Sequence, residues 1–82
     1  MKHEEILKRV QKVTSIVLSL DEEECTKEKS FTTDLGADSI QSIELMAGFD
    51  AEFDIEMDED DALACQTIGE AADFIATYVN DK

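Results

Sequence analysis

The chain has 82 residues and a formal net charge of −14, which bounds it to one small domain. Its hydrophobic content of 43% is enough for a single core, whereas the absence of Pro and the presence of only three Gly disfavour a turn-rich β protein. No stretch approaches the roughly 20 apolar residues of a membrane span. Because the N-terminal segment also lacks the apolar region of a signal peptide, we expect a cytoplasmic protein.

The charge is distributed unevenly along the chain. Residues 1–29 contain six Lys or Arg and seven acids, whereas residues 30–81 contain fourteen acids and no Lys or Arg. Such a segment would repel nucleic acid and anionic membrane surfaces, so we expect neither nucleic-acid binding nor membrane insertion. The favoured partners are proteins with basic patches, drawn in by long-range attraction that salt weakens.

The first predicted element is an amphipathic helix from about residue 3 to residue 19. Apolar residues recur there at spacings of three and four, which places them on one helical face. The members of that face are Ile6, Val10, Val13, Val17 and Leu20. Residues 20–38 break the pattern and form a long loop, for which Phe31 and Leu35 are the expected anchors in the core. A loop of this length in so small a domain is usually functional or disordered.

A second helix is predicted from Ser39 to about Phe53. Asp38 suits the N-cap and Gln41 stands three residues on, a capping-box spacing that leaves Ser39 at the first helical position. Ser39 could itself be the cap, because sequence does not separate two such starts. Gly48 costs this helix about 1 kcal/mol relative to alanine, for which close packing or local softness would account. The expected apolar face consists of Leu45, Phe49 and Phe53, widened by Ile43, Met46 and Ala47.

A short third helix and a longer fourth helix complete the chain. Four acids at residues 58–61 precede a short apolar run, and acids in a first turn suit the helix dipole. Thr67 and Glu70 form a second capping box, which opens a helix to about Val79. Its inward side chains are expected to be Ile68, Ala71, Ala72, Ile75 and Val79, with Phe74 and Tyr78 at the core edge. The fold predicted for residues 1–82 is therefore all-α, a small four-helix bundle of three longer helices, a short third helix and a long first loop.

The candidates for chemistry are few. Ser39 stands where the unpaired backbone N–H groups of a helix start favour a covalently attached phosphate. Cys25 and Cys65 are interpreted as buried small hydrophobes rather than a disulfide. The single histidine, His3, leaves too few ligands for a zinc site, and neither cysteine has a histidine partner. We therefore expect a modified serine in a protein that is not itself an enzyme and has no dedicated metal site.

Three segments carry a resemblance to a known family. Residues 34–40 (Asp-Leu-Gly-Ala-Asp-Ser-Ile), the Ile-Glu-Leu of residues 43–45 and the Glu-Phe-Asp of residues 52–54 resemble the acyl carrier proteins of fatty acid and polyketide synthesis, and the similarity covers essentially the whole chain. The resemblance implies that a phosphopantetheinyl transferase attaches 4'-phosphopantetheine to Ser39. It further implies that Asp38 helps the transferase to position a magnesium ion. The thiol of the prosthetic group would then carry acyl groups as thioesters.

The resemblance also implies two sets of contact residues on a monomeric carrier. A partner-docking set would receive the basic patches of acyl-transferring, condensing and reducing enzymes; its members are Ile40, Glu44, Asp50, Asp54 and Glu56. A second set would line an acyl pocket; its members are Phe31, Leu45, Phe49, Met57, Cys65 and Ala71. The bulk of Phe49 leads to the hypothesis that it changes the chain length that can be sheltered.

Departures from the family pattern bear on the pathway. Gln41 and Ala51 stand where acids are frequent, and Asp58 stands where a proline is frequent, which favours a second carrier dedicated to one pathway. Two other functions stay open: a carrier of amino acids or peptides, and an acidic interaction module that is never modified. The aspartate before Ser39 favours the acyl type. A calcium sensor built on the acids of residues 50–58 is disfavoured, because that run lacks the glycine of a calcium loop and lies partly on a predicted helix.

Overall fold

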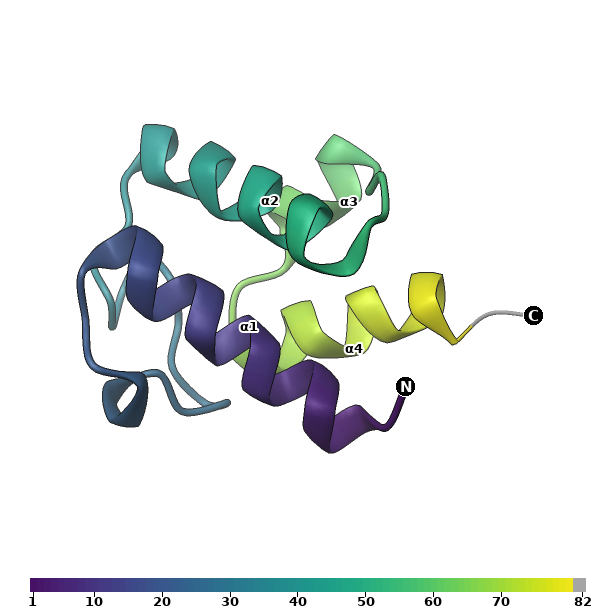
Figure 1. Cartoon of the computed structure of the whole chain (residues 1–82). Helices are drawn as coiled ribbons and strands as arrows, with labels where there is room; N and C mark the ends of the chain where they lie inside the picture. The colour runs from purple at the N-terminus through teal and green to yellow at the C-terminus, as the bar shows by residue number, and fades with distance from the viewer. Residues whose placement is uncertain (81–82) are drawn as a thin grey trace.

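The structure is a computed structural model that describes residues 1–80, and its elements are helical (Figure 1). In chain order they are α1 (His3–Leu18), the 3-10 turn η1 (Glu22–Glu24), α2 (Ser39–Phe53), α3 (Glu59–Ala64) and α4 (Ile68–Val79). Helix α1 packs against both α2 and α4, and α3 lies beside α2. The all-α prediction is confirmed, with four α-helices at the predicted places; η1 was not predicted.

One core joins the three longer helices. The predicted faces of α1 and α4 are buried at Ile6, Val10 and Val13 and at Ile68, Ala71, Ala72 and Ile75, whereas Val17, Leu20 and Val79 pack partly buried at its edge. Helix α2 contributes Leu45, Phe49 and Phe53, as predicted. Met1 and Asn80, the first and last residues that the structure describes, lie at the same end of the molecule (Figure 1), where the Met1 amine donates to Asn80 Oδ1 at 2.8 Å.

The predicted core face of α2 is wrong at two positions. Ile43 is 50% exposed, and Ala47 is exposed as well. Each stands two residues before a buried residue, Leu45 or Phe49, and two residues correspond to a rotation of about 200° around a helix. Helix α2 is thus apolar on nearly all sides, and α1 and α3 cover only part of that surface. Ile43 therefore becomes available for contacts outside the domain.

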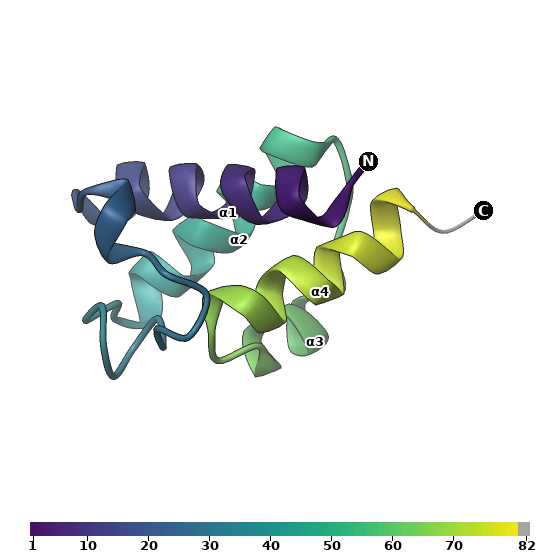
Figure 2. The same cartoon turned by 90° about the horizontal axis from the view of Figure 1, so that it is seen from below.

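Backbone hydrogen bonds connect the long loop to the start of α4. The Phe31 N–H donates to the Gln66 carbonyl at 2.9 Å, and the Ile68 N–H donates to the Lys29 carbonyl at 3.1 Å. An isolated antiparallel bridge pairs Ser30 with Thr67. Figure 2 shows the loop passing beside the start of α4. Phe31 is buried and Leu35 packs against the core, so both predicted anchors are confirmed.

Gly48 is explained by the close approach of α1 and α2. A Cβ atom built on Gly48 would lie 2.8 Å from Val13 Cγ1 and 3.8 Å from Val17 Cγ2. Valine is stiff at χ1, so the Val13 methyl group cannot move aside without changing rotamer. Of the two sequence-based accounts of Gly48, close packing is therefore the correct one.

We expect Gly48→Ala to destabilise the fold, even though alanine is the better helix former by about 1 kcal/mol. Overpacking of a core costs about 1–3 kcal/mol and outweighs that gain. In the double variant with Val13→Ala the clash is absent, so the two substitutions should be less damaging together than their separate effects predict. Urea unfolding of the four proteins of this cycle measures both quantities. A Gly48→Ala protein more stable than the parent would contradict the packing account.

Candidate functional site

The start of α2 is fixed by a reciprocal capping box. The Gln41 N–H donates to Asp38 Oδ1 at 2.7 Å, and the Asp38 N–H donates to Gln41 Oε1 at 3.2 Å. Asp38 itself has extended backbone angles, φ −91° and ψ −175°, as an N-cap requires. Asp38 is therefore the cap, and Ser39 is the first helical residue. The alternative in which Ser39 caps the helix is wrong.

Ser39 is left with a free hydroxyl. Its side chain is exposed and makes no hydrogen bond within residues 1–80. The N–H groups of Ser39 and Ile40 open the helix, where no earlier turn supplies carbonyl acceptors. These donors and the helix dipole favour an anion attached at this point.

The turn that leads into α2 is held by its own backbone. Gly36 has φ +76°, a left-handed conformation that glycine adopts without steric cost. One residue later the Ala37 N–H donates to the Phe31 carbonyl at 2.8 Å, and Ala37 is buried. The Asp34 carboxylate accepts from the Ser30 N–H at 2.8 Å. The turn is thus anchored on both sides, and it delivers Asp38 and Ser39 to the surface.

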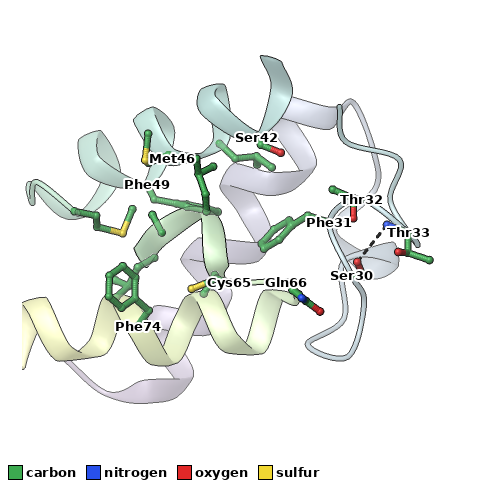
Figure 3. Close-up of a pocket in the computed structure, with 16 residues that line it drawn as sticks. Ser30, Phe31, Thr32, Thr33, Ser42, Met46, Phe49, Cys65, Gln66 and Phe74 are labelled. Atoms are coloured by element: carbon green, nitrogen blue, oxygen red, sulfur yellow. Dashed lines mark hydrogen bonds between the residues drawn. The ribbon is translucent and has the colours of Figure 1, made fainter. Parts of the chain in front are cut away.

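A cavity of about 300 Å³ that is partly open to solvent lies between the loop, α2, α3 and α4 (Figure 3). The six residues predicted for an acyl pocket all line this single cavity: Phe31, Leu45, Phe49, Met57, Cys65 and Ala71. Sequence reasoning missed its other lining residues, which are Ser30, Thr32, Thr33, Ser42, Met46, Ala62, Leu63, Gln66, Phe74 and Ile75. Helical spacing could have found part of them, because Ser42 and Met46 share a face with Phe49, and Phe74 and Ile75 share one with Ala71.

The predicted docking residues divide into exposed side chains and one with a structural contact. Ile40 is 69% exposed, and Glu44, Asp54 and Glu56 are exposed. Asp50 is half-buried, and its Oδ1 accepts from the Met57 N–H at 3.2 Å. The Asp50 carboxylate thus holds the segment that follows α2, in addition to any contact with a partner.

Two exposed apolar side chains near the docking set were not predicted as part of it. Ile43, placed in the core by the sequence analysis, follows Ile40 by three residues on the surface of α2, and Leu63 of α3 is 47% exposed. Residues three apart are neighbours on a helix, so Ile40, Ile43 and the adjacent Glu44 form one patch. We call these three residues the α2 patch. It offers a partner both apolar area and a negative charge beside Ser39.

Two acids, one near the end of α2 and one before α3, make other contacts in the fold. Glu52 pairs with Arg9 at 3.7 Å, and the Asp58 carboxylate caps α3 by accepting from the Asp61 N–H at 3.1 Å.

Within residues 1–80, no three His, Cys, Asp or Glu side chains gather closely enough to hold a metal ion. In the same part of the chain, no helix combines the length and apolar character needed to cross a bilayer.

The two cysteines are free thiols in different surroundings. Cys25 is fully buried in the core, whereas Cys65 is half-buried and lines the cavity. Burial raises the pKa of both thiols, and nearby acids add to it, chiefly Glu24 for Cys25 and Glu70 for Cys65. The interpretation as a buried hydrophobe is confirmed for Cys25 and holds in part for Cys65.

We expect iodoacetamide to alkylate Cys65 well before Cys25 in the folded protein, because only Cys65 reaches solvent. The reactive form is the thiolate. Since its pKa is raised above the ordinary value of 9.0, Cys65 should react more slowly than free cysteine at about pH 8 and accelerate as the pH rises. Peptide mass mapping at several pH values measures both rates. Equal rates for the two cysteines without unfolding would contradict the burial described here.

A small helical bundle with a free serine hydroxyl at a helix start and a partly open cavity has the architecture of a carrier domain. Comparison with known proteins supports the assignment to this class. Residues 4–75 match the family described as "phosphopantetheine attachment site". The chain is 46% identical over 71 residues to the acyl carrier protein of Caulobacter vibrioides, covering 87% of this chain and 91% of that protein. It is 39% identical over 79 residues to the acyl carrier protein of Cyanidium caldarium, covering 96% of this chain and 92% of that protein.

The chain belongs to the acyl carrier protein family, whose prosthetic group is 4'-phosphopantetheine. Members of this family are carriers rather than catalysts. The start of α2 fits the group chemically: Ser39 offers an unbonded hydroxyl, α2 has no acid within its first turn, and the opening N–H groups suit a phosphodiester.

Proposed function

We propose that Ser39 carries the 4'-phosphopantetheine group and that the protein is a monomeric, cytoplasmic acyl carrier. When attached, the group supplies a terminal thiol that holds acyl chains as thioesters for fatty acid or related biosynthetic enzymes. The observation that carries this proposal is the free hydroxyl of Ser39 beside a cap already supplied by Asp38. The departures at Gln41 and Ala51 support a carrier dedicated to one pathway, because they lower the negative charge along α2.

Asp38 is proposed to serve the phosphopantetheinyl transferase as well as the helix. Its Oδ1 accepts from the Gln41 N–H, which leaves Oδ2 to approach a magnesium ion held by the transferase. Carboxylate oxygens are the protein ligands that magnesium prefers. Asparagine caps a helix about as well as aspartate but has no negative charge. The two roles of Asp38 can therefore be separated by one substitution.

We expect incubation with coenzyme A, magnesium and a transferase to add one phosphopantetheinyl mass to the parent protein and none to Ser39→Ala. Ser42→Ala, which changes the next serine on the same helix, is the matched control and should load normally. Asp38→Asn should keep its stability and load slowly, whereas Asp38→Ala should also lose about 0.5–2 kcal/mol of stability. Intact-mass spectrometry and urea unfolding measure these effects.

Each failure of this experiment has a distinct meaning. No mass gain with any competent transferase would leave an acidic interaction module that is never modified. Loading of the Ser39→Ala protein would place the attachment elsewhere. Normal loading of Asp38→Asn would assign to Asp38 a structural role alone.

The α2 patch is proposed to be the surface on which partner enzymes dock. Its apolar side chains supply contact area, and Glu44 beside them faces the basic patches expected on partners. A single exposed charge pair contributes only about 0.2–1 kcal/mol, so Asp54 and Glu56 are proposed to add to the attraction. Contacts of this strength suit a carrier that must leave each enzyme.

We expect Ile43→Ser to weaken the association with the transferase about fivefold, which corresponds to about 1 kcal/mol, without unfolding the carrier. Because Ile43 is half exposed, its loss should change the free energy of unfolding by no more than about 0.5 kcal/mol. Ile16→Ser on α1, where the side chain is 66% exposed, is the matched control and should bind as the parent does. Surface plasmon resonance measures the affinity of each variant for the transferase, and urea unfolding measures its stability. Equal affinities for the two variants would contradict docking at the α2 patch.

A further inference from the structure

The first residues of the chain bring together nitrogen donors that the site around Ser39 does not use. Met1 carries a free amine, Lys2 and His3 follow it, and His3 is the single histidine of the chain. The amine, two backbone amides and an imidazole thus supply four nitrogens within one short stretch. Three of them belong to the main chain, so they lie outside the side-chain clusters from which a metal site was excluded above.

The spacing of these nitrogens suits one coordination geometry. A metal bound by the Met1 amine, the amide nitrogens of Lys2 and His3, and His3 Nδ1 closes a series of small fused chelate rings, because only a few covalent bonds separate each donor from the next. Rings of this size hold the four nitrogens in one plane around the metal. Cu(II) and Ni(II) prefer this square-planar arrangement, whereas Zn(II) takes four ligands at tetrahedral positions.

The two amide nitrogens are available at the start of α1. Lys2 is the N-cap and His3 is the first helical residue, and N–H groups at these positions have no helical carbonyl as an acceptor. The Lys2 carbonyl accepts from the N–H groups of Glu5 and Ile6, both at 3.1 Å. Coordination through nitrogen uses none of the atoms in these two hydrogen bonds. A bound metal would therefore change only the extreme end of the helix.

The imidazole of His3 is held with the required nitrogen free. His3 Nε2 lies 2.6 Å from Asp73 Oδ1, a contact that joins α1 to α4. A carboxylate only accepts hydrogen bonds, so Nε2 carries the hydrogen, and the lone pair of the neutral ring lies on Nδ1. Histidines that bind metals commonly donate their other N–H to a carboxylate in this way. The His3 side chain is 54% exposed, so an ion from solvent can reach it.

We propose that the 82-residue chain binds one Cu(II) or Ni(II) ion through the Met1 amine, the amide nitrogens of Lys2 and His3, and His3 Nδ1, with Asp73 orienting the imidazole. On binding, the Met1 ammonium and the two amides each release one proton. The two amide anions then balance the charge of the ion. The Met1 amine leaves Asn80 Oδ1, which it otherwise contacts at 2.8 Å.

This metal site is independent of the modification proposed for Ser39. Figures 1 and 2 show the N-terminus and the start of α2 toward opposite ends of the molecule. No residue of the metal site belongs to the turn before α2 or to the α2 patch. The two assignments can therefore fail separately.

The experiment uses the 82-residue protein with Ser39 unloaded and the free Met1 amine confirmed by intact mass. A Cys65→Ser background removes the half-buried thiol, which would bind or reduce Cu(II). We expect CuCl2 to give a violet d–d absorption band and NiCl2 a yellow, diamagnetic complex, and excess ZnCl2 to displace neither ion. Calorimetry in two buffers of different protonation enthalpy should report the release of about three protons per ion.

His3→Ala should abolish the violet band, and so should acetylation of the Met1 amine. The matched control is His3→Ala combined with Glu4→His, which returns the imidazole one residue later and should not restore the band. Asp73→Asn should keep the band but weaken the binding of Ni(II) about tenfold, because the imidazole is less firmly oriented. Asp60→Asn on α3, which removes the same charge elsewhere, should leave the affinity unchanged.

Two results would overturn the site. One is the same copper spectrum in the parent and in His3→Ala, which would mean that the acidic surface collects the ion. The other is displacement of Ni(II) by Zn(II). Equal affinities of Asp73→Asn and the parent for Ni(II) would overturn the role of Asp73.

Discussion

The capping box between Asp38 and Gln41 decides where α2 begins, and the rest of the site depends on that residue. If the helix began one residue later, the Ser39 hydroxyl would accept a backbone hydrogen bond as the cap and would no longer be free. Because Asp38 fills this role, Ser39 enters the helix exposed and unbonded. The turn before it, with Gly36 at a positive φ and Ala37 buried, holds the cap at the surface.

Helix α2 serves three neighbours at once, which accounts for its apolar residues on nearly all sides. One face packs on α1, closely enough that Gly48 has room for no side chain beyond hydrogen. A second face, with Ser42 and Met46, lines the cavity. The third carries the α2 patch. An amphipathic surface helix usually shows one apolar stripe, and the extra apolar residues here mark surfaces that a lone domain would not need.

The sequence was informative wherever a local rule decides the structure. Helical spacing and two capping boxes predicted the four helices, and the family resemblance supplied six residues that share one cavity. Long-range geometry accounts for what was missed. Backbone hydrogen bonds join distant parts of the chain, between Phe31 and Gln66 and between Lys29 and Ile68. No local sequence pattern therefore predicts that Thr32 and Thr33 line the cavity. Ile43 was misplaced because apolarity alone does not say which side of α2 is covered.

In the docking that we propose, the unpaired acids and the exposed isoleucines act at different stages of the encounter with a partner. Within residues 1–80, only Glu52 and Asp73 among the acids that follow residue 30 pair with a basic side chain, so most of this charge stays available to a partner. Charge of this kind speeds the approach and adds little to the final affinity. The contact area would then come from the side chains of Ile40 and Ile43. Their combined area is far below the area that a stable interface buries. An interface that forms fast and holds weakly releases its partner fast, as delivery of a cargo to successive enzymes requires.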